Sequence, residues 1–222
     1  MLMTAPLPRR LIAEFIGTAF LLTGVIGSGI MAERLTDDVG LQLLANAGAT
    51  VGVLYTIILM FGPVSGAHFN PAVTLSDASL TSRLWSDVAP YIAAQISGGA
   101  VGVIIANLMF ELDAVNVSEK VRDGSGQYIG EVVATFGLVF LIFSLVRTGR
   151  DALAAGSVAA YIGGAYWLTS STSFANPAVS VTRTLSNTFA GIDPGSMPMF
   201  ILMQLVGAGL AVAAITVIYP EE

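Results

Sequence analysis

The sequence predicts an all-α integral membrane protein with six transmembrane helices, two re-entrant half-helices and an inverted internal repeat. Three observations predict this fold class: the composition, the spacing of long apolar stretches, and an Asn-Pro-Ala triplet that occurs once in each half of the chain. Hydrophobic residues make up 55% of the 222 residues and charged residues only 11%. About a quarter of the residues of an average soluble domain are charged, so this composition indicates a membrane protein.

Apolar stretches of membrane length follow one another along the chain. About 20 residues of helix are needed to cross about 30 Å of hydrocarbon. The expected spans are Leu11–Met31, Leu41–Phe61, Val88–Phe110, Tyr128–Val146, Leu153–Thr169 and Met197–Tyr219. Together with two half-helices they nearly exhaust the chain, which predicts a single transmembrane domain over residues 1–222, with repeat halves at about 10–110 and 125–219.

Each triplet predicts the start of a short helix, because Asn is a preferred N-cap and Pro is favoured at the first helical position. The two triplets are Asn70-Pro71-Ala72 and Asn176-Pro177-Ala178. The stretches before them, 62–69 and 169–175, are rich in Gly and Ser and are expected to be non-helical. Such backbone is tolerated at membrane depth only where it is buried or lines a water-filled path. The triplets therefore predict a pore.

The two halves of the chain resemble each other. Ala13-Glu14-Phe15-Ile16-Gly17-Thr18 parallels Gly130-Glu131-Val132-Val133-Ala134-Thr135, and Gln95-Ile96-Ser97-Gly98-Gly99 parallels Gln204-Leu205-Val206-Gly207-Ala208. Each half holds three spans, an odd number, so the second half must be inverted in the membrane. Inverted repeats place their functional site near the midplane, where the N-termini of broken helices face it.

The chemistry of this centre follows from the two helix starts. Two positive dipole ends converge there, and each Asn oxygen can cap its own helix while its amide hydrogens face the lumen. Asn70 and Asn176 are thus expected to form a central constriction that donates hydrogen bonds to a passing water or hydroxyl oxygen. The positive field opposes cations.

Few other polar residues lie deep in the spans. Intramembrane carboxylates are functional candidates by default, so Glu14 and Glu131 have two readings: each accepts backbone N–H bonds from the re-entrant segment of its own half, or the two belong to a proton relay. His68 is expected to be a pore-wall or packing residue. With no cysteine and one histidine, no metal site, cofactor or catalytic residue is expected, and the protein is not expected to be an enzyme.

The basic residues predict the orientation in the cell membrane. Arg9, Arg10, Arg83, Arg147 and Arg150 fall on one side of the six-span arrangement, and Arg34, Lys120 and Arg122 on the other. The positive-inside rule then places both termini in the cytoplasm. The net charge of −6 lies mostly in loops and termini and indicates no nucleic-acid partner.

The segment Ser65-Gly66-Ala67-His68-Phe69-Asn70-Pro71-Ala72-Val73-Thr74 resembles the first signature of the aquaporin and aquaglyceroporin (major intrinsic protein) family. The second triplet and the paired Glu spans match too, so the resemblance covers nearly the whole chain. It implies passive conduction of water or small uncharged solutes through a pore in each subunit of a membrane-embedded homotetramer. It also implies a second constriction of four positions, one of them an arginine directly after the second triplet.

The sequence departs from the family at that constriction. Val179 stands where the arginine is expected, and family spacing places the other three positions at Thr50, Gly164 and Ser173. This set predicts a wide ring without a fixed charge. It resembles the aquaglyceroporins associated with bacterial arsenic-resistance operons, which pass trivalent arsenicals and methylated arsenic species.

Arg183 lies four residues after Val179 and is expected on the same helical face, at the outer mouth. The alternative is that Arg183 pairs with a loop acid or snorkels to the interface. The expected function is a passive channel for water and larger neutral solutes such as glycerol or arsenous acid. Alternatives are a water-selective channel whose filter Arg183 completes, a secondary transporter and, least favoured, an intramembrane enzyme.

Overall fold

The computed structural model describes residues 5–220 and is helical throughout its regular structure. In chain order the helices are α1 (Leu7–Leu35), α2 (Val39–Ser65), α3 (Pro71–Leu80), α4 (Val88–Met109), α5 (Ser125–Arg147), α6 (Ala154–Leu168), α7 (Pro177–Thr182) and α8 (Met197–Ile218). Short 3-10 turns at Trp85–Asp87 and Asp151–Leu153 lead into α4 and α6, and a third, Arg183–Leu185, follows α7. The predicted all-α fold with re-entrant half-helices is confirmed.

Five of the six expected spans are long and apolar enough to cross a membrane by themselves: α1, α2, α4, α5 and α8. The expected span at 153–169 is α6, which has only 15 residues. At 1.5 Å per residue this helix is about 22 Å long. Helix α6 ends early because its chain turns back into the bundle at Thr169 and leads to the second half-helix.

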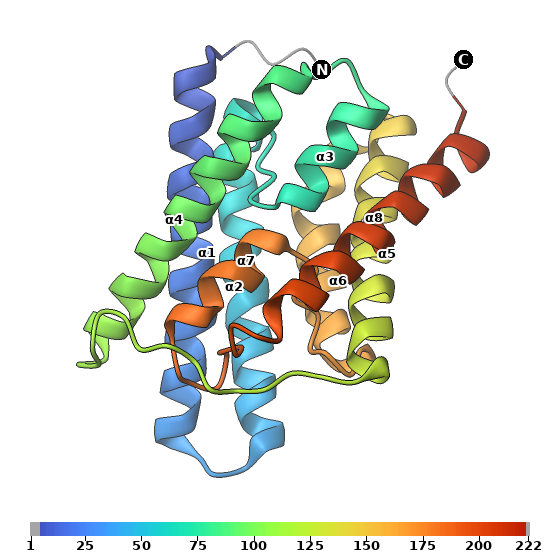
Figure 1. Ribbon diagram of the computed structural model, residues 1–222. Helices are drawn as coiled ribbons and strands as arrows, with labels where there is room; N and C mark the ends of the chain where they lie inside the picture. The colour runs from blue at the N-terminus through green and yellow to red at the C-terminus, as the bar shows by residue number, and fades with distance from the viewer. Residues whose placement is uncertain (1–4, 221–222) are drawn as a thin grey trace.

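The two half-helices lie inside the bundle and point their N-termini at its centre (Figure 1). Each is also packed against the other half of the chain: α3 contacts α8 and α5, and α7 contacts α4. Within each half, α1 packs on α4 and α5 packs on α8. The halves are therefore interlocked around the half-helices rather than lying side by side.

Glycines set the closest of these contacts. A Cβ added at Gly98 or Gly102 of α4 would lie 2.2 Å from a backbone oxygen of α1, at Phe15 and Ala19 respectively. In the second half, a Cβ at Gly207 of α8 would lie 2.5 Å from the Val132 oxygen of α5. Only a hydrogen atom fits at these positions, so the glycines allow close helix packing.

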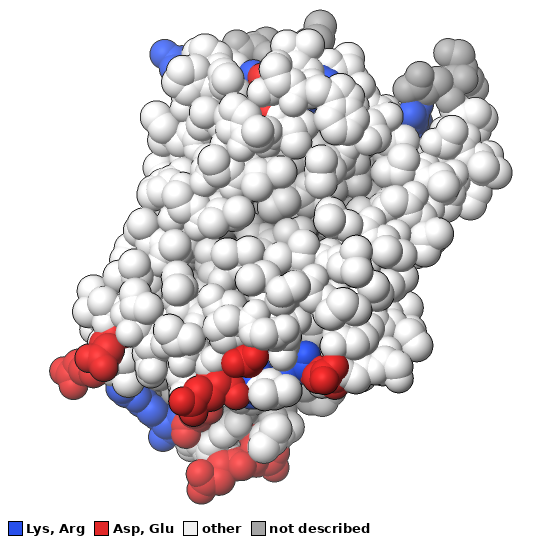
Figure 2. All heavy atoms as spheres, in the orientation of Figure 1, with Lys and Arg blue, Asp and Glu red and all other residues white. Residues whose placement is uncertain are grey.

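The surface in Figure 2 has a broad uncharged band around the middle, and acidic side chains gather at the end away from the chain termini. The membrane-length helices also expose many large apolar side chains, among them Phe20 of α1, Leu59 of α2 and Leu210 of α8. An uncharged, apolar belt of this kind is suited to lipid.

One part of the expected loop structure is wrong. The stretch 62–69 was expected to be non-helical, but α2 continues through Pro63 to Ser65. Gly66, with a φ of 89°, ends the helix in the left-handed conformation, and only Gly66–Asn70 leads into α3. Residues 169–175 before α7 are non-helical, as expected.

Candidate pore and its constrictions

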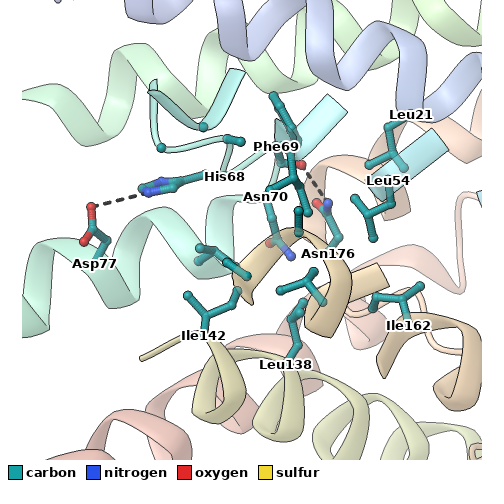
Figure 3. Close-up of a pocket in the computed structure, with 18 of the residues that line it drawn as sticks. Leu21, Leu54, His68, Phe69, Asn70, Asp77, Leu138, Ile142, Ile162 and Asn176 are labelled. Atoms are coloured by element: carbon teal, nitrogen blue, oxygen red, sulfur yellow. Dashed lines mark hydrogen bonds and ion pairs between the residues drawn. The ribbon is translucent and has the colours of Figure 1, made fainter. Parts of the chain in front are cut away.

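A cavity of about 950 Å³ lies between the helices and reaches the N-termini of both half-helices. Its lining extends from Arg10 and Arg83, at the end of the bundle that carries the chain termini, to Ser173 and Arg183 towards the opposite end. We call these ends the Arg83 mouth and the Arg183 mouth. Aliphatic side chains form most of the wall near the centre, including Leu21, Leu54, Leu138, Ile142 and Ile162 (Figure 3).

Asn70 and Asn176 meet in the middle of this cavity (Figure 3). The Asn70 oxygen accepts the Ala72 N–H at 2.9 Å, and its Nδ2 donates to the Ala175 oxygen at 2.7 Å. The Asn176 oxygen accepts the Ala178 N–H at 3.0 Å, and its Nδ2 donates to the Phe69 oxygen at 2.7 Å. An amide has two N–H donors, so each side chain can fix its orientation with one of them and offer the other to a solute.

Glu14 and Glu131 lie beneath the re-entrant segments and are fully buried. Glu14 accepts the backbone N–H groups of His68 at 3.0 Å and Phe69 at 2.7 Å. Glu131 accepts those of Phe174 and Ala175, both at 2.9 Å. Neither acid is among the residues that line the cavity. These contacts agree with the first of the two expected roles, in which each carboxylate accepts hydrogen bonds from the re-entrant backbone of its own half.

Two glutamines complete these networks, a role that was not predicted from the sequence. Gln95 donates to Glu14 at 2.8 Å and to the Thr74 hydroxyl at 3.0 Å. Gln204 donates to Glu131 at 2.6 Å and to the Ser180 hydroxyl at 2.8 Å. The signal that could have found them was present, because each is a polar residue at an equivalent place in the repeat. Each glutamine ties the buried acid to the first turn of a half-helix.

The backbone before each asparagine adopts the left-handed conformation at matching positions. Ala67 and Phe69, three and one residues before Asn70, both have a φ of 51°, while Ser173 and Ala175 before Asn176 have values of 53° and 50°. Non-glycine residues in such conformations cost on the order of 1–3 kcal/mol each. The hydrogen bonds to Glu14 and Glu131 offset this cost and hold the re-entrant backbone in shape.

Three of the four residues predicted for a second constriction lie on the cavity wall. Thr50, Ser173 and Val179 line the cavity, and all three are buried. Gly164 was also expected there, but it is exposed on the outer face of α6 and does not line the cavity. The physical reason is the phase of α6, since each residue turns the helix by about 100°.

Tyr166, two residues after Gly164, occupies the wall instead. Its hydroxyl lies 3.1 Å from the Thr50 hydroxyl, and the side chain is buried. Of the four residues expected to form a wide ring, Gly164 is thus absent from the cavity wall, and the larger Tyr166 of the same helix is present on it. The Ser173 hydroxyl, by contrast, is buried without a hydrogen-bond partner among the described residues, so it can bind a solute.

Arg183 also lines the cavity, although α7 ends one residue before it. The side chain is only 2% exposed. Its guanidinium carbon lies 3.5 Å from the centre of the Phe174 ring, and its Nε donates to the Ala190 oxygen. No described carboxylate pairs with it, so Arg183 neither binds a loop acid nor extends to the surface. Its place on the cavity wall agrees with the expectation that Arg183 lies on the pore-facing side of the chain.

At the Arg83 mouth, His68 joins a polar network. Its Nδ1 lies 3.0 Å from the Thr74 hydroxyl and its Nε2 3.4 Å from Asp77 Oδ2 (Figure 3). Arg83 pairs with the same carboxylate. The residues at this mouth also include the Arg10–Asp87 ion pair, at 2.8 Å. Both arginines here are paired with aspartates, and the described residues contain no group of three metal-ligating side chains.

The repeated helical bundle, the half-helices and the amide-flanked path define the class of helical membrane channels. The comparisons with known proteins make this specific. Residues 1–174 match the family model described as major intrinsic protein, and the chain belongs to that family.

Two curated relatives cover most of the chain. An aquaglyceroporin, AqpS, from Rhizobium meliloti is 49% identical over 93% of this chain and 88% of its own length. The aquaporin NIP6-1 from Arabidopsis thaliana is 29% identical over 96% of this chain and 70% of its own. A solved structure, the aquaglyceroporin from Plasmodium falciparum, has a TM-score of 0.72 at 19% identity and covers 96% of this chain and 97% of that one. That structural likeness supports the fold.

Proposed function

We propose that this protein is a passive membrane channel for water and small neutral solutes such as glycerol. The observation that supports it most is the pair of asparagines whose amides meet in the cavity, each held by a hydrogen bond to the opposite half. Such donors can replace the hydrogen bonds that a hydroxyl oxygen loses on leaving water. The aliphatic wall opposite them suits the CH face of a polyol. The AqpS relative is named an aquaglyceroporin.

The proposal assigns a role to each residue of the site. Asn70 and Asn176 form the central constriction, and Pro71, Ala72, Pro177 and Ala178 begin the half-helices that position them. Thr50, Ser173, Val179 and Arg183, together with Tyr166, form the second constriction. Glu14 and Glu131 are structural, and His68 is part of the wall. No catalytic step is assigned to any of them.

We further propose that four copies assemble in the cell membrane, each with its own pore and with both termini in the cytoplasm. The exposed apolar belt supports burial in lipid and against other subunits. The end of the bundle near the termini carries Arg10, Arg83 and Arg147. By the positive-inside rule, this supports a cytoplasmic Arg83 mouth. The Arg183 mouth then faces outward.

Stopped-flow light scattering on proteoliposomes tests the function, with water, glycerol, urea and arsenous acid as solutes. We expect glycerol flux that is independent of Na⁺ and proton gradients. Asn70→Asp and Asn176→Asp should each lower neutral flux and raise cation leak, because a carboxylate replaces an amide donor where the dipoles converge. Gradient-driven accumulation of glycerol would instead indicate a secondary transporter. Unchanged permeability in both variants would remove the assignment of the centre.

A water-selective channel is the second candidate, since Tyr166 and Arg183 narrow and charge a constriction that was expected to be wide. The same experiment separates the two. Water flux with no glycerol or arsenous acid flux above that of empty vesicles would favour the narrow filter. Passage of arsenous acid, a small neutral hydroxylated solute, would extend the solute range beyond polyols.

A further inference from the structure

Three cationic side chains gather at the Arg183 mouth around two phenylalanine rings. The guanidinium carbons of Arg183 and Arg122 lie 3.5 Å and 4.9 Å from the centre of the Phe174 ring. The Lys120 ammonium lies 4.7 Å from the centre of the Phe189 ring and donates to the Phe189 oxygen at 2.7 Å. Both arginines are buried although they carry like charges.

No acid neutralises these cations directly. Within residues 5–220, no carboxylate lies within 4.0 Å of a side-chain nitrogen of Arg122, Arg183 or Lys120. Their acceptors are backbone oxygens: Ala190 for Arg183, Gly191 at 2.9 Å for Arg122, and Phe189 for Lys120. At the opposite mouth, by contrast, Arg10 and Arg83 each pair with an aspartate. The positive charge at the Arg183 mouth is thus a local feature of this end.

The charge is also accessible from the cavity. Arg183 lines the cavity, and its two terminal nitrogens donate to none of the described residues. A guanidinium presents its donors as a planar fork that matches two oxygens of an oxyanion. The unpartnered Ser173 hydroxyl lines the same cavity. A ligand with several acceptor oxygens would satisfy donors that the protein leaves open.

Burial of uncompensated charge is unfavourable, and it therefore lowers the pKa of the two basic loop residues beside Arg183. Burial, together with the charges of Arg122 and Arg183, lowers the pKa of Lys120 to about 8. Burial lowers the pKa of Arg122 to about 10. Glu33, which accepts the Phe189 N–H at 2.9 Å, partly opposes the effect on Lys120. Glu131 also acts on Arg122, so three cations face two acids, and the cluster keeps a net positive charge that suits an oxyanion.

We propose that the Arg183 mouth is a binding site for a small divalent oxyanion of the sulfate type, bound by Arg183 on the cavity wall and favoured by the positive charges of Arg122 and Lys120 behind that wall. A bound anion lies in the path of the proposed channel and obstructs it. The obstruction of the channel rests on the proposed function, whereas the binding of the anion does not.

Binding is measured by isothermal titration of the purified full-length protein with sodium sulfate, against sodium isethionate at matched ionic strength and pH 7. We expect saturable sulfate binding that falls at least tenfold in Arg183→Gln. Arg183→Lys keeps the charge without the fork and should lose severalfold in affinity. Arg34→Gln is the matched control, because Arg34 also stacks on a phenylalanine and donates to a backbone oxygen but does not line the cavity.

Arg122→Gln and Lys120→Met keep the test decisive if Arg183→Gln does not fold, as judged by gel filtration and thermal melting. Both variants should weaken sulfate binding. Lys120 loses its proton as the pH rises through about 8, so wild-type affinity should fall between pH 7 and pH 9 and stay flatter in Lys120→Met. Absent binding in the wild type, or equal binding in folded Arg183→Gln and wild type, overturns the proposal.

Flux is measured in vesicles of zwitterionic lipid, so that added sulfate is the only oxyanion present. Sulfate should lower glycerol flux saturably in the wild type and Arg34→Gln, but not in Arg183→Gln. Sulfate binding without an effect on flux would contradict the position of the anion in the path. A protein that binds sulfate but conducts no solute would instead refute the proposed function and leave the anion site established.

Discussion

At the scale of single residues, two buried carboxylates determine the shape of the pore backbone. Glu14 and Glu131 each accept two consecutive N–H groups from a strained loop and a third bond from a glutamine. Buried N–H groups without an acceptor are costly, so these acids stabilise the only loop shape that aims the asparagines at each other. These contacts favour a structural role for both acids.

Glu131→Gln is expected to destabilise the protein by about 2 kcal/mol or more, because an amide accepts through only one of its two terminal atoms and an N–H donor is left without an acceptor. Thermal melting in detergent measures the loss. Glu119→Gln is the control, since Glu119 is exposed and its side chain makes no hydrogen bond among the described residues. If Glu131→Gln melts like the wild type but loses proton-coupled transport, the acid belongs to a relay.

Val179→Arg is expected to narrow the second constriction. Val179 is buried on the cavity wall, so a guanidinium there adds bulk and charge beside Arg183. Glycerol flux should fall at least tenfold, and water flux much less. An equal loss for both solutes, or no loss, would show that Val179 does not limit the passage.

How far the sequence predicts the site depends on the kind of residue. Asn70 and Asn176 are predictable because a cap and a proline define a helix start locally. Tyr166 is not, because its place depends on the rotation of α6, which is set by packing against α2 and by the end of the helix at Leu168. The strain at Ala67 and Ser173 is also hidden, since neither residue type favours a positive φ.

At the scale of helices, the fold depends on pairs that approach closely at glycines. The sequence predicts these helices well, because apolar length and repeat symmetry are properties of whole segments. It predicts their ends less well: Pro63 and Gly62 suggested a loop, yet α2 continues to Ser65 because Gly66 is the residue that takes the left-handed cap.

Gly98→Ala should prevent correct packing of α1 on α4, because the new methyl group would lie 2.2 Å from the Phe15 oxygen. Overpacking of this kind typically costs about 1–3 kcal/mol or more. Gly209→Ala is the matched control: it is also a helical glycine, but a Cβ there meets nothing within 4 Å, and the change should stabilise by up to about 1 kcal/mol. Melting temperatures of the two variants test this; equal shifts would contradict it.

At the scale of the whole molecule, the proposed pore relies on hydrogen-bond donors in fixed positions. The chain contains no cysteine. The two mouths differ in their electrostatics, since charges are paired at the Arg83 mouth and unpaired at the Arg183 mouth. The overall fold was predictable, whereas this difference was not, because it depends on which residues the loops bring together.

Water and glycerol flux should be insensitive to mercuric chloride, because mercurials block channels by capping a thiol and none is present. Stopped-flow traces before and after treatment measure this, and a Val179→Cys variant supplies the positive control. Reversible block of the wild type would show that a group other than a thiol controls the pore.

The crossed bonds between the two asparagines and the opposite loops also constrain biosynthesis. When the first half has been inserted, the Asn70 amide and the Phe69 oxygen still lack the partners that residues 175 and 176 provide. The face of α4 that receives α7 is likewise uncovered until α7 has been made. The two asparagines can therefore reach this arrangement only after residues 175 and 176 have been made, and a chain truncated before residue 175 is expected to give no conductance. A chain that conducts has therefore been synthesised at least as far as α7.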